Sequence, residues 1–171
     1  LLWPALRTVA GRRHRAFGWA LAGLFLLVGG FYADALRGQY PMRWLLAVPG
    51  LVMVLIIVAM SRISMRIVNR SIDEAGEGGA PYLARPPKRN LAILCIVLFT
   101  LAEFWHPGGR VSGWLACAAA AALCNLMGDW HVGRPLLRRW PFMLYAVYVC
   151  MALGYALIGT ALLAGGPGAS A

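Results

Sequence analysis

Five long apolar segments, separated by short polar connections, constrain this chain more than any other feature. Each approaches or exceeds the roughly 20 residues that cross about 30 Å of hydrocarbon as a helix. The segments are residues 16–36, 44–60, 91–105, 112–127 and 141–163. The third and fourth are short, so we expect their ends to tilt or to thin the bilayer. The sequence predicts an all-α bundle of about five transmembrane helices, with residues 1–171 as a single domain.

The charge of the chain is consistent with this interpretation. Only 13% of the residues are charged, about half the share that is usual in a soluble domain. A formal charge of +10 would suggest nucleic acid as the partner of a soluble protein. Here the bases lie between the apolar segments, as the positive-inside rule produces. We therefore expect a lipid bilayer, and no nucleic acid, as a partner.

The distribution of Lys and Arg predicts the orientation. Thirteen of the 16 lie before the first, after the second or after the fourth apolar segment. Such a bias predicts a cytoplasmic N-terminus and an external C-terminus in a bacterial inner membrane. The bases expected at the membrane surface are Arg12, Arg13, Arg15, Arg62, Arg66, Arg70, Arg138 and Arg139.

The second helix is expected to continue past the membrane. Arg62, Arg66 and Arg70 recur at a spacing of four residues and form one basic stripe, which predicts a helix that reaches about residue 70. Pro49 is expected to loosen or kink it. Residues 71–89 are rich in Gly and Pro and are predicted to form a cytoplasmic loop.

Glu103 and His106 lie one helical turn apart near the outer end of the third segment, so they share a face. Ionisable groups at this depth are costly and often functional. One interpretation is a proton relay or a heme or metal ligand, with His106 as donor and Glu103 orienting it. The other is an interfacial pair in which His106 ends the helix before Pro107. His131, at a predicted cytoplasmic edge, is a further candidate ligand.

Two cysteines give a second candidate metal site. Cys117 and Cys124 are seven residues apart and share a face of the fourth helix. Soft sulfur donors suit Cu(I). The same spacing also describes a packed stripe of small residues, because free Cys in an apolar helix usually behaves as a small hydrophobe. Both interpretations stay open at this point.

The fourth and fifth helices carry the expected contact surfaces. Small residues let helices approach closely in lipid, and buried tyrosines need hydrogen-bond partners. The residues predicted to contact other membrane subunits, or a cofactor edge in the case of the tyrosines, are Ala118, Ala122, Tyr145, Tyr148, Tyr155 and Gly159.

From the second helix onward the chain resembles the NnrS family of polytopic bacterial membrane proteins. The similarity is carried by residues 60–63 (MSRI) with 69–70 (NR), and by residues 128–141 (GDWHVGRPLLRRWP) leading into 144–148 (LYAVY). It implies binding of heme and copper and a link to the nitric-oxide stress response. It also implies that the chain covers a central and later part of a longer family member. Ser61 stands where the family shows Gly, and Tyr145 stands near the place of a helical His.

Two functions are expected from different classes. The first is an accessory or scaffold subunit of a larger bioenergetic membrane complex on an NnrS-like framework. The alternative is an NnrS-like heme or copper protein of the nitric-oxide response. A transporter component is third, because no inverted repeat is evident. No phosphate loop, zinc hydrolase motif or nucleophile elbow is present in the sequence, so we do not expect an independent enzyme.

Overall fold

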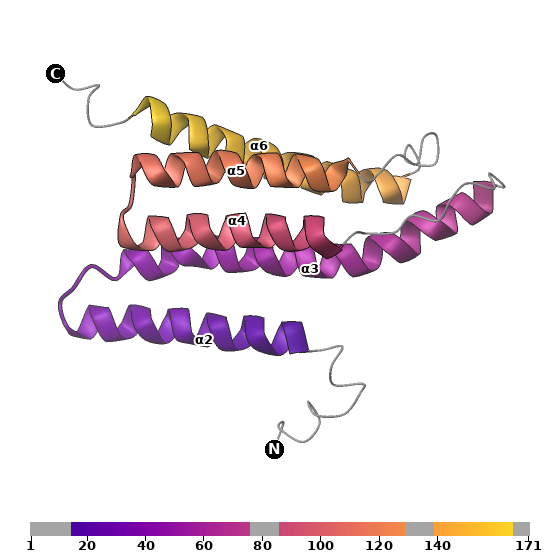
Figure 1. The fold of residues 1–171 in the computed structure, drawn as a ribbon. Coiled ribbons are helices and arrows are strands. Elements are labelled where there is room, and N and C mark those ends of the chain that lie inside the picture. The colour runs from indigo at the N-terminus through magenta and orange to yellow at the C-terminus, as the bar shows by residue number, and fades with distance from the viewer. Residues whose placement is uncertain (1–14, 76–85, 129–138, 166–171) are drawn as a thin grey trace, which may run out of the picture. The chain divides into compact units, whose positions relative to one another are not determined.

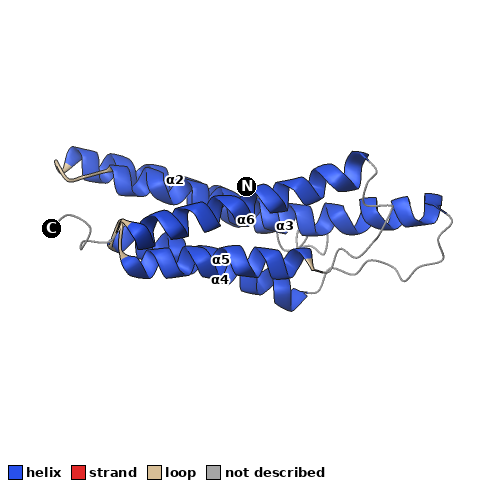
Figure 2. Ribbon diagram, turned by 90° about the horizontal axis from the view of Figure 1, so that it is seen from above, coloured by secondary structure: helices blue, strands red, loops and turns tan. Residues whose placement is uncertain are grey.

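The computed structural model describes residues 15–75, 86–128 and 139–165, and all regular structure in them is α-helical (Figure 2). The all-α prediction is confirmed. Figure 1 labels the helices, which are α2 (Arg15–Leu36), α3 (Met42–Ala75), α4 (Pro86–Trp105), α5 (Arg110–Met127) and α6 (Arg139–Ala164).

The connection between α3 and α4 differs most from its prediction. The sequence predicted a loop over residues 71–89, whereas α3 continues to Ala75 and α4 already begins at Pro86. Proline is tolerated in the first helical turn because backbone N–H groups have no partner within the helix there. Pro49 lies inside α3, which continues through it.

Four of the described helices are long and apolar enough to cross a membrane, over Gly18–Leu36, Met42–Ile63, Arg110–Met127 and Pro141–Ala164. This confirms a polytopic membrane protein. Helix α4 is not among the four, because its 20 residues include Lys88, Arg89 and Glu103. A fifth span through α4, the orientation of the chain and its single domain stay predictions.

The chain divides within α3 into two compact units, Leu1–Ile56 and Ile57–Ala171. In the first, α2 and the beginning of α3 form a hairpin that turns through residues 37–41. Gly38 adopts a φ of 67° in this turn, a backbone conformation that glycine adopts without steric cost. A Cβ atom on Gly23 would lie 3.3 Å from the Leu51 side chain, which shows how closely α2 packs on α3.

In the second unit, α5 packs against α4 and against α6. Each of these pairs is antiparallel (Figure 1). Edge-to-face packing of Phe99 on Tyr155, with ring centroids 5.6 Å apart, joins α4 to α6. The core of this unit consists mainly of small and aliphatic side chains. It includes Ile57, Ala92, Ile96, Ala116, Ala119 and Leu123, all of them fully buried.

Two glycines lie at the contact between α5 and α6 and allow a close approach of the helices. A Cβ on Gly159 would lie 2.6 Å from Cys117 Sγ and 3.0 Å from the carbonyl oxygen of Gly113. A Cβ on Gly113 would lie 2.9 Å from Leu163. Because dispersion forces between closely packed helices stabilise association in lipid, these glycines are the structural basis of this contact.

Candidate functional site

The turn between α4 and α5 carries the strongest candidate site. Helix α4 ends at Trp105, and the backbone N–H of His106 still donates to Ala102 O over 2.8 Å. Pro107 cannot donate a further helical hydrogen bond, so the chain leaves the helix here. Gly108 then adopts a φ of 74°, and the N–H of Gly109 donates to His106 O over 3.3 Å. These interactions place His106 at the start of the turn, where it is exposed.

The two carboxylate oxygens of Glu103 have different environments. Oε1 accepts a 3.0 Å hydrogen bond from the backbone N–H of Gly108. Oε2 is buried and has no hydrogen-bond partner in the part of the chain that the structure describes. The sequence led us to expect that Glu103 orients the imidazole of His106. The hydrogen bond found here is made to the backbone of the turn, two residues beyond the histidine.

A second buried oxygen lies on the other side of the same turn. Ser112, in the first turn of α5, is 1% exposed, and no described residue forms a hydrogen bond with its Oγ. A Cβ on Gly109 would lie 4.0 Å from this Oγ, which places the hydroxyl against the turn. Gly109 precedes α5 and provides no side-chain cap. Both helices therefore bring an unsatisfied oxygen to the turn that carries His106.

The described residues do not gather the predicted ligands into a site with three or more donors. His131 lies outside the described residues, as do Arg12, Arg13 and Arg138. Across residues 15–75, 86–128 and 139–165, no group of three or more His, Cys, Asp or Glu side chains could hold a metal ion.

The two candidate sulfur ligands lie in different environments. Cys124 is exposed, whereas Cys117 is partly buried and packs on Gly159. Metal binding by this pair stays a prediction.

Most of the predicted contact residues pack inside the chain. Tyr148 and Tyr155 are 2% and 6% exposed, and Ala122 is also buried. Gly159 lies at the close contact with α5. Among these six residues only Ala118 is exposed. Gly159 of this stripe packs on α5 and Tyr155 packs on Phe99 of α4. Binding of the stripe to another subunit stays a prediction.

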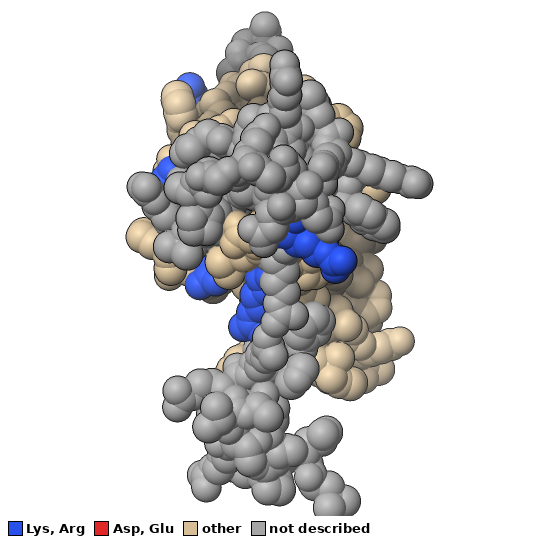
Figure 3. Space-filling view, turned by 90° about the vertical axis from the view of Figure 1, so that its right-hand side faces the viewer, with Lys and Arg blue, Asp and Glu red and all other residues tan. Residues whose placement is uncertain are grey.

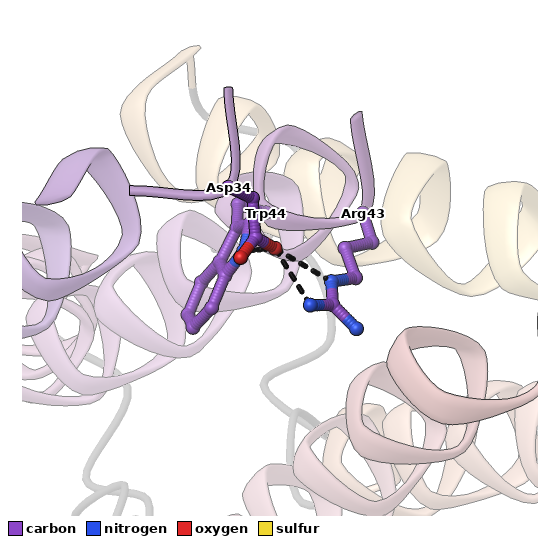
Figure 4. A network of polar contacts seen from close by, with 3 residues as sticks. All are labelled: Asp34, Arg43 and Trp44. Atoms are coloured by element: carbon purple, nitrogen blue, oxygen red, sulfur yellow. Dashed lines mark hydrogen bonds and ion pairs between the residues drawn. The ribbon is translucent and has the colours of Figure 1, made fainter. Parts of the chain in front are cut away.

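The structure contains a polar network that sequence reasoning missed. Asp34, near the end of α2, is 5% exposed and accepts hydrogen bonds from Arg43 and Trp44 at the start of α3 (Figure 4). One sequence signal could have found it. An acid within an apolar segment is costly unless it is paired, and Arg43 lies just across the turn from Asp34.

Basic side chains lie at one end of the second unit. Viewed onto the right-hand side of Figure 1, the described side chains include lysines and arginines but no acid (Figure 3). Arg62 and Arg70 are exposed on α3, and Lys88 and Arg89 lie in the first turn of α4. The side chains of Arg15, Arg66 and Arg139 lie outside the described part. Glu103 is at the opposite end of α4 from Lys88 and Arg89.

Comparison with known proteins supports the resemblance noted in the sequence. The model of a family described as NnrS protein matches residues 1–171, so the similarity also covers α2, which precedes the blocks that first indicated it. No protein with a curated description matches the chain. No solved structure matches it either.

Proposed function

The chain belongs to the NnrS family of membrane proteins, and on that premise we propose that it binds heme or copper and acts in the nitric-oxide response. Family membership over the whole chain is the observation that carries this proposal. The positive-inside bias supports a location in a bacterial inner membrane, with the N-terminus in the cytoplasm.

The described residues suit a single bond from the His106 imidazole to heme iron better than they suit a closed copper site with several donors. His106 presents an exposed imidazole on a turn whose backbone is held by three hydrogen bonds. Imidazole is a common axial ligand of heme iron. A closed copper site needs more donors than the described residues assemble in one place. Any further donor for copper must therefore come from the rest of the chain or from a second molecule.

Glu103 and Ser112 would complete the surroundings of the bound group. Their buried oxygens, Glu103 Oε2 and Ser112 Oγ, have no hydrogen-bond partner among the described residues. Buried polar atoms are normally hydrogen-bonded, so each such exception calls for an explanation. A bound group with positive charge or a hydrogen-bond donor would satisfy these oxygens. When bound, heme iron supplies an open coordination position for a diatomic gas.

The accessory-subunit role rested on the small residues of α5 and the tyrosines of α6. Four of those six residues are buried within the chain, and this leaves them little surface for a partner. Association with a larger bioenergetic complex therefore stays a prediction, with less support than the heme or copper function.

The proposal is tested by purifying the full chain in detergent and measuring its absorption spectrum, heme content and metal content. We expect a Soret band, or bound copper, at a ratio approaching one per chain. We also expect the Soret band of the reduced protein to shift when nitric oxide is added. A colourless protein that stays free of heme and copper after expression with both supplied would contradict the proposal. Co-purification with respiratory subunits in that same preparation would favour the accessory role.

A further inference from the structure

Two glycines follow Pro107 in the turn after α4, so the backbone there is conformationally permissive unless a further contact fixes it. A positive φ at Gly108 is accessible to glycine but costly for other residues. Position 109 also favours glycine, because a Cβ there would lie 3.2 Å from His106 O. The hydrogen bond from Gly108 N–H to Glu103 Oε1 closes this turn onto the last turn of α4. The position of the exposed imidazole of His106 therefore depends on an interaction made by Glu103.

We propose that Glu103 is the positioning residue for ligand binding at His106. One of its carboxylate oxygens fixes the turn that presents the imidazole, and the other stays available to the group that His106 binds. This inference rests on the proposed function. It differs from the usual arrangement, in which a carboxylate accepts the second N–H of a ligating imidazole.

The division of roles between the two oxygens follows from their contacts. Oε1 is occupied by the Gly108 N–H at 3.0 Å. Oε2 is removed from solvent and accepts no hydrogen bond from residues 15–75, 86–128 and 139–165, which is costly for a carboxylate oxygen. Ser112 Oγ, beside the same turn, is also buried and has no hydrogen-bond partner among the described residues. A cationic or donor-bearing group held at His106 would remove this cost, so the turn is prepared for such a group.

Glutamine and alanine at position 103 separate the two roles. Glu103→Gln keeps a carbonyl oxygen that can accept from Gly108 N–H, but it replaces the second acceptor with an NH₂ donor. Glu103→Ala removes both oxygens. Thr100→Ala is the matched control, because Thr100 lies one turn earlier on α4 and its hydroxyl donates to Ile96 O within the same helix.

The first measurement is a hemin titration of the detergent-purified full chain, followed by the Soret band. We expect Glu103→Ala to weaken hemin binding by about 10- to 100-fold, the range typical when a group that orients a ligand is lost. Glu103→Gln should weaken it less, and Thr100→Ala should bind as the unmodified chain does. Equal affinity in all four proteins would overturn the role of Oε2.

The second measurement needs no heme. A spin label is attached at His106→Cys in a chain whose four native cysteines are replaced, with Glu, Gln or Ala at position 103. Label mobility should rise in the Ala variant and stay unchanged in the Gln variant. Unchanged mobility in the Ala variant would overturn the positioning role. Failure of the unmodified chain to bind hemin would instead overturn the proposed function together with the role of Oε2.

Discussion

Trp44 Nε1 donates a hydrogen bond to Asp34 Oδ2 over 2.7 Å. The same oxygen accepts from Arg43 Nε at 3.1 Å and from Arg43 Nη2 at 2.6 Å. Asp34 belongs to α2, and both donors belong to the first turn of α3. Because a buried carboxylate in an apolar segment needs such partners, this network joins the two helices across their turn.

Removing the Asp34 carboxylate is expected to lower the thermal midpoint of the protein in detergent. Asp34→Ala leaves the donors of Arg43 and Trp44 without their acceptor. The double variant with Arg43→Ala should lose less stability than the sum of the two single variants, because contacting residues are coupled. Asp34→Ala combined with Trp19→Ala should be close to additive, because Trp19 is exposed and lies about four helical turns before Asp34 on α2. Additivity for positions 34 and 43 would contradict the network.

The neighbouring glycines Gly29 and Gly30 provide a matched pair for the Trp44 packing. A Cβ on Gly30 would lie 2.5 Å from the Trp44 ring, whereas a Cβ on Gly29 would meet nothing within 4 Å. Gly29→Ala should stabilise α2 by up to about 1 kcal/mol through helix propensity. Gly30→Ala should instead destabilise the protein by about 1–3 kcal/mol through overpacking. If both substitutions shift the thermal midpoint of the unmodified chain in the same direction, this packing is contradicted.

The α5–α6 contact gives a similar test. Gly159→Leu would place its side chain against Cys117 Sγ and the α5 backbone. A Cβ added at Gly154, on the same helix, would meet nothing within 4 Å. We expect Gly159→Leu to cost at least about 1–3 kcal/mol. Gly154→Leu should be tolerated. The thermal midpoint and the yield of monodisperse protein are measured for both variants. Equal values for Gly159→Leu and Gly154→Leu would disprove the close contact.

The helices could be predicted from sequence because their signal is local. Apolar length and basic flanks fix where a segment enters and leaves the membrane, and α2, α5 and α6 lie close to their predicted bounds. The Asp34 network was missed because it depends on two helices meeting across a turn. The role of Gly159 was only partly foreseen. The tyrosine stripe was recognised as a contact surface, but a sequence does not say whether its partner is in the same chain.

The candidate site was predictable in position but not in geometry. The spacing of Glu103 and His106 identified the outer end of the third segment. The contact of Glu103 with Gly108 depends on a left-handed glycine two residues beyond the histidine. Ser112 was not singled out, because a serine in the first turn of a helix usually has an ordinary capping or solvated role. Only its burial distinguishes it.

Whether α4 crosses the membrane can be measured by thiol labelling. Single cysteines are introduced at Gln39, Gly78 and Gly108 in a chain without its native cysteines. If α4 spans the membrane as predicted, positions 39 and 108 should react with a membrane-impermeant maleimide added outside intact cells. Position 78 should react only after the cells are opened. Labelling of position 108 only in opened cells would show that α4 does not cross.

The most direct test of the central claim, a heme or copper site at the α4–α5 turn, is the heme and metal content of His106→Ala. It should be purified in parallel with the unmodified chain and with Cys150→Ala, whose thiol is exposed on α6. We expect the unmodified chain and Cys150→Ala to retain equal heme or copper. His106→Ala should lose most of it while keeping the same elution volume and thermal midpoint. A fully loaded His106→Ala protein would contradict the assignment.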